Sequence, residues 1–155
     1  MLQEQNTSRL VYLTEDDEDD RILFLEALRE LHPEIFVKVF EDGQQLLDNL
    51  CRTEFNKPEI IFLDINMPRK NGFECLKEIR NRSMFRDVKI IMFSTSSSIL
   101  HIELCHKLGA DYYAIKPGPF HKLKELLSEI MAIDWDGIPT NKTEFILTGR
   151  KINTI

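Results

Sequence analysis

The chain has 155 residues, and 43% of them are hydrophobic, which suits one domain with a full core. Its formal net charge of −6 argues against a nucleic-acid-binding surface, because phosphate backbones attract clustered Lys and Arg. Segment 1–9 lacks the apolar core of a signal peptide, and no apolar stretch reaches the length of a membrane span. We therefore expect a cytoplasmic protein that binds neither nucleic acid nor membrane.

The cysteines do not form a recognisable framework. Cys51, Cys75 and Cys105 fall in predicted helices, and their odd number suits buried thiols in a reducing compartment better than disulfides. His101 stands four residues before Cys105, but no second pair of ligands accompanies them. The spacing therefore argues against a zinc site.

Five short β-rich runs alternate with helical patterns along the chain. The predicted strands are 10–14, 35–40, 59–64, 88–93 and 111–115. The third and fourth are nearly continuous apolar runs, as is typical of parallel strands buried on both faces.

Apolar residues at helical spacing fall between and after these strands. They are Phe24, Ala27, Leu28 and Leu31; Leu46, Leu47 and Leu50; Leu100, Leu104 and Leu108; and Leu123, Leu126, Leu127, Ile130 and Met131. Asn71 and Glu74 have the spacing of a capping box at the start of the third helix. Gly109 suits the end of the fourth helix and Pro119 the first turn of the fifth.

Five βα units predict an α/β fold with a doubly wound (βα)5 parallel sheet, because right-handed crossovers leave few other topologies. At this length we expect the flavodoxin-like strand order 2-1-3-4-5. Residues 1–133 would form this domain. Residues 134–155 would be a C-terminal tail, too short for an output domain.

The predicted tail is more apolar than a disordered segment needs to be. Its apolar residues are Trp135, Ile138, Phe145, Ile146 and Leu147. They could pack back on the domain, or they could dock a partner or a second copy of the chain, which would make a homodimer.

Polar residues follow four of the predicted strands. Glu15 and Asp16 come after the first strand, Asp64 ends the third, Ser94 follows the fourth and Lys116 the fifth. Because the site of such a sheet lies at the carboxyl ends of its strands, we expect these side chains to converge.

Three carboxylates in one place raise each other's pKa unless a cation compensates them. Mg²⁺ suits this role because it binds a few oxygen ligands together with water and a phosphate. Mg²⁺ and Lys116 would bring the charge close to neutral before a phosphoryl group arrives. Of the six consecutive acids 15–20, we expect the first two to take part and the other four to face water.

Each of these residues also has a simpler interpretation. A lone Asp at a strand end is usually a helix cap or turn former, and a Lys before Pro is usually just exposed. The hydroxyls of 94–98 could cap the fourth helix, for which one of the last three is expected. Their joint placement on four strand ends favours a site.

This constellation resembles the receiver domain of two-component response regulators, over about residues 9–133. The run Asp64-Ile65-Asn66-Met67-Pro68 with Gly72, and the pair Lys116-Pro117, stand as the family has them. The resemblance implies that Glu15 and Asp16 are the acidic pair that binds Mg²⁺, and that Asp64 is the phospho-accepting aspartate. It also implies a cis peptide bond between Lys116 and Pro117.

The resemblance assigns four further roles. Asn66 would offer its backbone carbonyl to the metal, and Lys116 would oppose the charge of the phosphoryl group. Ser94 would bind a phosphoryl oxygen and move inward, and Tyr113 would then fill the space as an aromatic switch. The chain departs from the family pattern in having Glu15 in place of Asp, Thr95 in place of a small residue and Gly118 where Phe is common.

The implied function is that of a stand-alone response regulator. Its donor would be a phosphohistidine on a sensor histidine kinase or a histidine phosphotransfer protein, and its output would be binding to a downstream protein. It would be a signalling protein that catalyses only its own phosphorylation and dephosphorylation.

Two alternatives remain open at this point. One is a receiver-like scaffold that is never phosphorylated. The other is a phosphatase of the haloacid dehalogenase type, but Asn66 occupies the place where that family needs a second Asp, and the chain lacks room for a cap domain.

Overall fold

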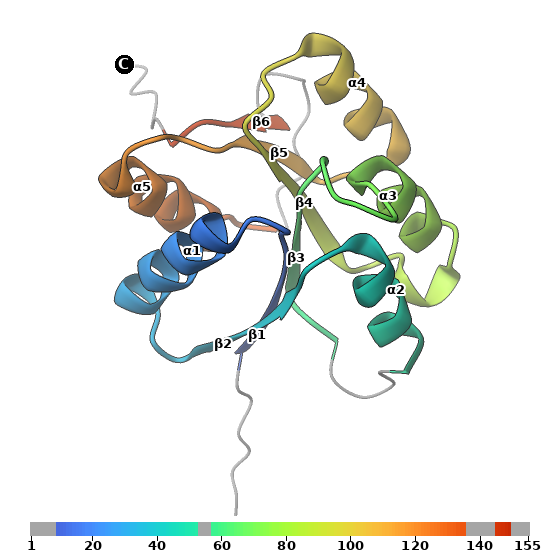
Figure 1. Ribbon diagram of the computed structural model, residues 1–155, viewed down its shortest axis with the longest axis horizontal. Helices are drawn as coiled ribbons and strands as arrows, with labels where there is room; N and C mark the ends of the chain where they lie inside the picture. The colour runs from blue at the N-terminus through green and yellow to red at the C-terminus, as the bar shows by residue number, and fades with distance from the viewer. Residues whose placement is uncertain (1–8, 53–56, 136–144, 150–155) are drawn as a thin grey trace, which may run out of the picture.

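The structure is a computed structural model that describes residues 9–52, 57–135 and 145–149. Its centre is a parallel sheet of six strands in the order β2-β1-β3-β4-β5-β6 (Figure 1). The first five follow the predicted order 2-1-3-4-5, so the prediction of a doubly wound, flavodoxin-like sheet is confirmed. The strands are β1 (Arg9–Thr14), β2 (Ile35–Phe40), β3 (Ile60–Leu63), β4 (Lys89–Ser94), β5 (Tyr112–Ile115) and β6 (Ile146–Leu147).

Helices cover both faces of the sheet (Figure 1). One face carries α1 (Glu18–Leu31) and α5 (Phe120–Met131), and the other carries α2 (Gly43–Arg52), α3 (Gly72–Arg80) and α4 (Ile99–Leu108). A short 3₁₀ helix spans Ser83–Phe85. Because every central strand is apolar on both sides, each layer has its own core cluster.

Local signals set the helix ends. The Asn71 side chain accepts from the Glu74 backbone N–H, and the Glu74 side chain reaches back, which completes the predicted capping box of α3. Ser98 caps α4, as expected for one of the last three hydroxyls of the loop. Gly109 ends α4 with a φ of 104°, a left-handed conformation that favours glycine.

Two of the three leucines that predict α4 do not belong to its buried face, whereas Leu108 packs against the core. Leu100 and Leu104 are 76% and 39% exposed, whereas Ile102 and Cys105 are buried against the sheet. The helix has apolar residues on more than one side, so their spacing indicates a helix without deciding which face the core covers. Ile99, 61% exposed, adds to this apolar surface of α4.

The described part of the tail packs back on the domain. Ile146 and Leu147 form β6, which pairs in parallel with β5 and extends the predicted five-stranded sheet. Phe145 is buried, and its ring lies edge-on to that of His106, with the centroids 4.7 Å apart. Trp135 lies edge-on to Tyr112. Ile138 lies outside the described residues.

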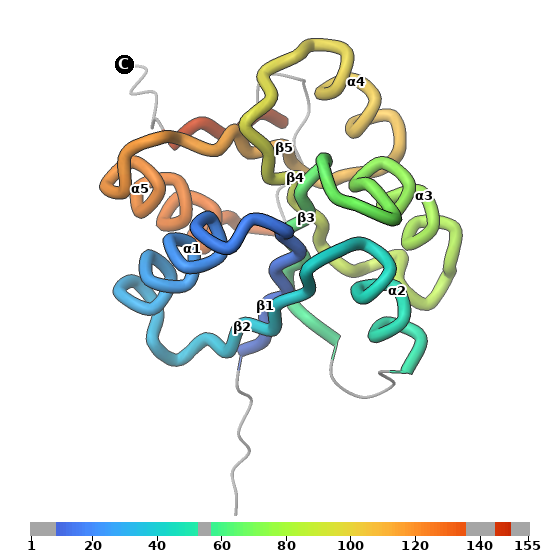
Figure 2. Tube along the Cα trace, viewed as in Figure 1, coloured from blue at the N-terminus to red at the C-terminus, as the bar shows by residue number. Residues whose placement is uncertain are grey.

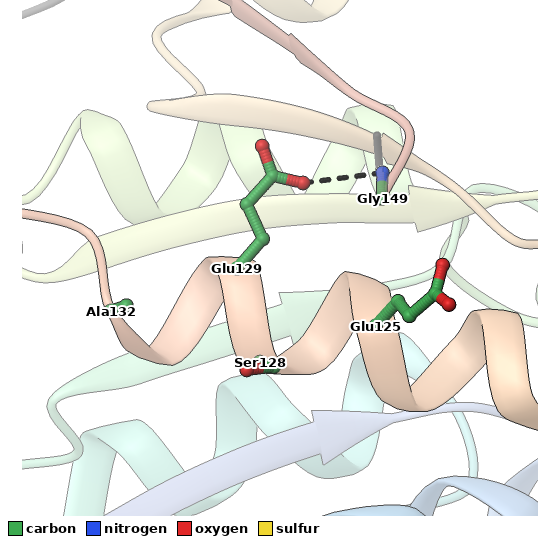
Figure 3. Close-up of a pocket in the computed structure, with 5 residues that line it drawn as sticks. All are labelled: Glu125, Ser128, Glu129, Ala132 and Gly149. Atoms are coloured by element: carbon green, nitrogen blue, oxygen red, sulfur yellow. Dashed lines mark hydrogen bonds between the residues drawn. The ribbon is translucent and has the colours of Figure 1, made fainter. Parts of the chain in front are cut away.

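A pocket of about 610 Å³ lies between α5 and the end of the tail (Figure 3). Figure 3 shows Glu129 reaching from α5 to Gly149, whose backbone N–H donates to Glu129 Oε1 at 3.2 Å. Glu125, Ser128 and Ala132 also line this pocket. None of these residues belongs to the predicted strand-end site.

Two further observations concern the peptide bonds and the helices of the described residues. The part of the chain that the structure describes has no cis peptide bond, so the expectation of a cis Lys116–Pro117 bond was wrong. The trans isomer is the ordinary one, favoured by about 0.5–1 kcal/mol before proline. Within the described ranges no helix combines the length and the apolar character that crossing a membrane requires.

Candidate functional site

The loops after β1, β3, β4 and β5 leave the sheet at its carboxyl edge (Figure 2). There Glu15, Asp16, Asp64 and Lys116 come together. Backbone hydrogen bonds hold the first residues past the strands in place. The N–H of Glu15 donates to the Phe40 carbonyl at 2.9 Å, and that of Asp64 donates to the Thr14 carbonyl at 3.2 Å. These side chains therefore start from positions fixed by the sheet.

Three carboxylates form a cluster at this edge. One oxygen from each of Glu15, Asp16 and Asp64 lies within 4.8 Å of the others. Glu15 and Asp64 are buried, and Asp16 is exposed. Asp64 Oδ1 accepts from the Ile65 backbone N–H at 2.8 Å. Such a set of oxygen ligands fits a hard divalent cation.

Gly72 allows α3 to begin directly beside Asp64. A Cβ at this position would lie 2.3 Å from the Asp64 carbonyl oxygen, which no side chain could tolerate without a backbone shift. The Gly72 N–H also donates to the Ile65 carbonyl at 2.8 Å. The glycine is therefore explained by the close approach of the helix to the strand end.

Lys116 binds the carboxylates from β5. Its Nζ lies 2.5 Å from Glu15 Oε1 and 3.6 Å from Asp64 Oδ2. It also lies 3.2 Å from Asp20 Oδ2. The Lys116 side chain is only 9% exposed, so these ion pairs act in a partly desolvated place, where charges interact more strongly than in water.

Asp20 is a site residue that the sequence interpretation missed. It was expected to face water with the rest of the acidic run, but it lies in the first turn of α1 and its side chain contacts Lys116. Asp17 also has a structural role, because its side chain caps α1 by accepting from the Asp20 backbone N–H. No local pattern signals the contact of Asp20 with Lys116, because the two residues are 96 positions apart in the chain.

Burial dominates the electrostatics of the cluster. It raises the pKa of Glu15 to about 7, although the hydrogen bond from Lys116 opposes the rise and the charge of Asp64 adds to it. Burial likewise raises the pKa of Asp64, against the opposing charge of Lys116. Burial lowers the pKa of Lys116, but Asp64 and Glu15 outweigh it and the net shift is upward. The cluster therefore gains from a bound cation, which favours the ionised carboxylates.

The β4 side of the site consists of neutral groups. Ser94 is fully buried, and its Oγ accepts from the Ser96 backbone N–H at 3.1 Å. Tyr113 is also fully buried, and its hydroxyl donates to the Ser96 carbonyl at 2.8 Å. Burial raises the pKa of Tyr113, while its hydrogen bonds with Ser94 and Ser96 oppose the rise. Asn66 lies exposed in the loop after β3, two residues beyond Asp64.

A pocket of about 220 Å³ adjoins the site beside Lys116. Asp20 and Lys116 line its charged side, and Leu23, Phe93 and Phe120 contribute to its apolar side. Thr95 and Gly118, two of the positions that depart from the family pattern, also line it. The charged cluster thus adjoins a pocket whose lining is partly apolar.

Comparison with known proteins gives the class of this site. The family model for the response regulator receiver domain matches residues 11–128. The chain therefore belongs to the response regulator receiver domain family, as the motifs around Asp64 and Lys116 predict. Receiver domains are signalling domains.

Several relatives are individually similar. The probable methanogenesis regulatory protein FilR2 of Methanothrix harundinacea (strain 6Ac) is 26% identical over 84% of this chain and 87% of that protein. The chemotaxis protein CheY homolog of Campylobacter jejuni is 32% identical over 59% of this chain and 68% of that protein. Two other response regulators are longer, and the match spans 42% and 48% of them.

Solved structures agree with this fold. The phosphorylated cyanobacterial phytochrome response regulator RcpA has a TM-score of 0.75 and 26% identity, and the match covers 80% of this chain and 91% of that one. The Mn(2+)-bound form of the response regulator Rcp1 has a TM-score of 0.73, and the match covers 85% of this chain and 99% of that one. Its identity is 21%, so this likeness concerns the fold.

Proposed function

We propose that this protein is a stand-alone response regulator that accepts a phosphoryl group on Asp64. The observation that carries the proposal is the position of Lys116, which contacts both Asp64 and Glu15 in a cluster of three carboxylates. Carboxylates held by a cation at the end of a parallel sheet suit a nucleophile that must tolerate an incoming phosphoryl group.

The metal in this proposal is Mg²⁺. Glu15, Asp16 and Asp64 would hold it with their carboxylates, and Asn66 with its backbone carbonyl. When bound, it neutralises negative charge on the phosphoryl oxygens. The raised pKa values of Glu15 and Asp64 support this assignment, because both groups gain from a cation that stabilises their ionised forms.

The proposed reaction is an in-line phosphoryl transfer. A carboxylate oxygen of Asp64 bonds to phosphorus as the phosphorus–nitrogen bond of a phosphohistidine breaks, and the imidazole leaves with its electron pair. Lys116 opposes charge on the transferred oxygens, and Ser94 donates its hydroxyl hydrogen to one of them. The donor is a sensor histidine kinase or a histidine phosphotransfer protein, and the apolar pocket beside Lys116 supports contact with such a partner.

The proposed output is protein binding. Ser94 and Tyr113 act as the switch, since both bond to Ser96 at the entrance to α4. Ile99, Leu100 and Leu104 give α4 an exposed apolar surface on which a downstream protein or a second copy of the chain can dock. The three described cysteines are free thiols, which supports a cytoplasmic location.

The test is incubation with Mg²⁺ and acetyl phosphate, followed by intact-mass spectrometry. We expect one phosphoryl adduct on the wild type and none on Asp64→Asn. Asp87→Asn, which changes an exposed carboxyl outside the cluster, is the matched control and should keep the adduct. A wild type without an adduct would support the scaffold, and turnover of many phosphoesters would support the phosphatase.

A further inference from the structure

The loop between β4 and α4 has Ser96 at its centre. The Ser96 backbone N–H donates to Ser94 Oγ at 3.1 Å, and its carbonyl accepts from the Tyr113 hydroxyl at 2.8 Å. Ser96 Oγ lies 2.9 Å from His101 Nδ1, on the first turn of α4. One residue is therefore bonded to Ser94, to Tyr113 and to the helix that follows.

The contact with His101 is one of two that Ser96 Oγ makes. The Ser98 backbone N–H donates to Ser96 Oγ at 3.2 Å. The Ser96 hydroxyl and His101 Nδ1 can hydrogen-bond in either imidazole tautomer, because a hydroxyl both donates and accepts. Every backbone and side-chain polar group of Ser96 is thus engaged, and the loop cannot shift without breaking a bond.

The His101 ring has a second fixed neighbour. It lies edge-on to the Phe73 ring of α3, with the centroids 5.5 Å apart and an angle of 63° between the planes. The ring is half-buried, whereas Ile99 and Leu100 on the same turn are exposed. Packing against α3 therefore holds the imidazole where it can bind Ser96.

We infer that His101 is a positioning residue that acts through Ser96 on both Ser94 and Tyr113. The Ser96 N–H donates to Ser94 Oγ and so fixes the position of the hydroxyl that would bind a phosphoryl oxygen on Asp64. The Ser96 carbonyl keeps the Tyr113 hydroxyl bound within the core. This inference rests on the proposed phosphorylation of Asp64, and it adds a residue of α4 to the control of that site.

The test uses variants that separate the two contacts of His101. His101→Phe keeps an aromatic ring beside Phe73 but removes Nδ1. His101→Asn loses the ring but keeps an amide group that can hydrogen-bond to Ser96 Oγ. Ser96→Ala removes the hydroxyl and keeps both backbone bonds, and the double variant His101→Phe/Ser96→Ala closes a double-mutant cycle.

Two readouts are needed. The first is the initial rate of phosphorylation by acetyl phosphate with Mg²⁺, followed by intact mass. The second is the NMR signals of the Tyr113 ring and of the Ser94 and Ser96 amides in the unphosphorylated protein. Far-UV circular dichroism and thermal unfolding establish that each variant is folded.

We expect His101→Phe to lower the rate by about threefold to tenfold, the range of one lost hydrogen bond. Ser96→Ala also loses the bond from the Ser98 N–H and should lower the rate at least as much. Both should shift the Tyr113 and Ser94 signals, the double variant should match Ser96→Ala, and His101→Asn should resemble the wild type. Additive losses, equal losses in His101→Asn and His101→Phe, or unchanged signals would overturn the inference.

The two proposals fail in different ways. If the wild type forms no adduct, the proposed function fails, but the NMR comparison still decides whether His101 positions the loop. If all variants form the adduct at the wild-type rate, only the role of His101 is wrong.

Discussion

The two halves of the site are held by different forces. Glu15, Asp64 and Lys116 directly follow β1, β3 and β5. They interact through charge, with Lys116 Nζ 2.5 Å from Glu15 Oε1 and 3.6 Å from Asp64 Oδ2. Ser94 and Tyr113 interact instead through neutral hydrogen bonds to backbone groups of Ser96. The charged half responds to cations and pH, whereas the neutral half responds to the position of one loop. The difference suggests that metal binding and the switch can be perturbed separately.

The largest effect on the charged half should come from Lys116→Met. Removing an electrostatic partner of the transferred oxygens should slow phosphorylation by on the order of a hundredfold. Mg²⁺ should bind at least as tightly as in the wild type, because the ammonium no longer competes for Glu15 and Asp64. Isothermal titration and intact mass measure both quantities. Lys122→Met, an exposed lysine of α5, is the control, and equal losses in the two variants would contradict the role of Lys116.

The pH dependence of Mg²⁺ binding should follow Glu15. Its pKa of about 7 means that the carboxyl takes up a proton below that pH, and the protonated form does not bind the metal. The affinity for Mg²⁺ should therefore fall by up to about tenfold for each pH unit below 7. Glu15→Gln should bind Mg²⁺ more weakly and with a flatter pH profile. A wild-type affinity that is constant from pH 5 to 8 would contradict this assignment.

The same shift predicts the stability of the metal-free protein. The folded-state pKa of Glu15 lies above the unfolded value of 4.5, so the fold binds its proton more tightly. That contribution to the free energy of unfolding is present below pH 4.5 and is lost as the pH rises through 7. Urea unfolding with and without Mg²⁺ measures it, and added Mg²⁺ should restore stability above pH 7.

Asp20→Asn should change the properties of the site less than Lys116→Met or Glu15→Gln does. The Asp20 side chain is 41% exposed, and partly exposed ion pairs contribute little. Without this carboxylate, Lys116 should pair more strongly with Glu15 and Asp64 and compete with the metal for them. The affinity for Mg²⁺ should therefore fall by about twofold to fivefold. Asp19→Asn makes the same charge change on an exposed residue of the same turn. If both variants lose the same amount of Mg²⁺ affinity, the cause is the change in net charge rather than the lost contact with Lys116.

The smallest effect on metal binding should come from Tyr113→Phe. It removes the hydrogen bond to the Ser96 carbonyl, so the free energy of unfolding should fall by about 1 kcal/mol. The affinity for Mg²⁺ should stay unchanged, because the hydroxyl belongs to the neutral half. Tyr12→Phe removes another tyrosine hydroxyl from the same core cluster and should leave the NMR signals of residues 94–98 in place. A change in the Mg²⁺ affinity of Tyr113→Phe would contradict the separation of the charged half from the neutral half.

The charged half was more predictable than the neutral half. Glu15, Asp64 and Lys116 each follow an apolar strand directly, so knowing the strands was enough to place them on one edge of the sheet. Ser96 and His101 interact across a loop and a helix start whose conformation no local pattern specifies. Asp20 was not predictable either, because its contact with Lys116 depends on how α1 sits against the end of β5.

The sequence by itself determined the alternation of strands and helices, the strand order and the gathering of carboxylates at one edge. These follow from the apolar periodicity and from the handedness of βα connections, which are properties of short segments. Only the tertiary structure decided that Leu100 and Leu104 face outward, that residues 146–147 add a sixth strand, and that Ser96 links Ser94 to Tyr113 and His101. Those outcomes depend on which surfaces pack together, because contacts between distant segments compete for the same space and the same hydrogen-bonding groups.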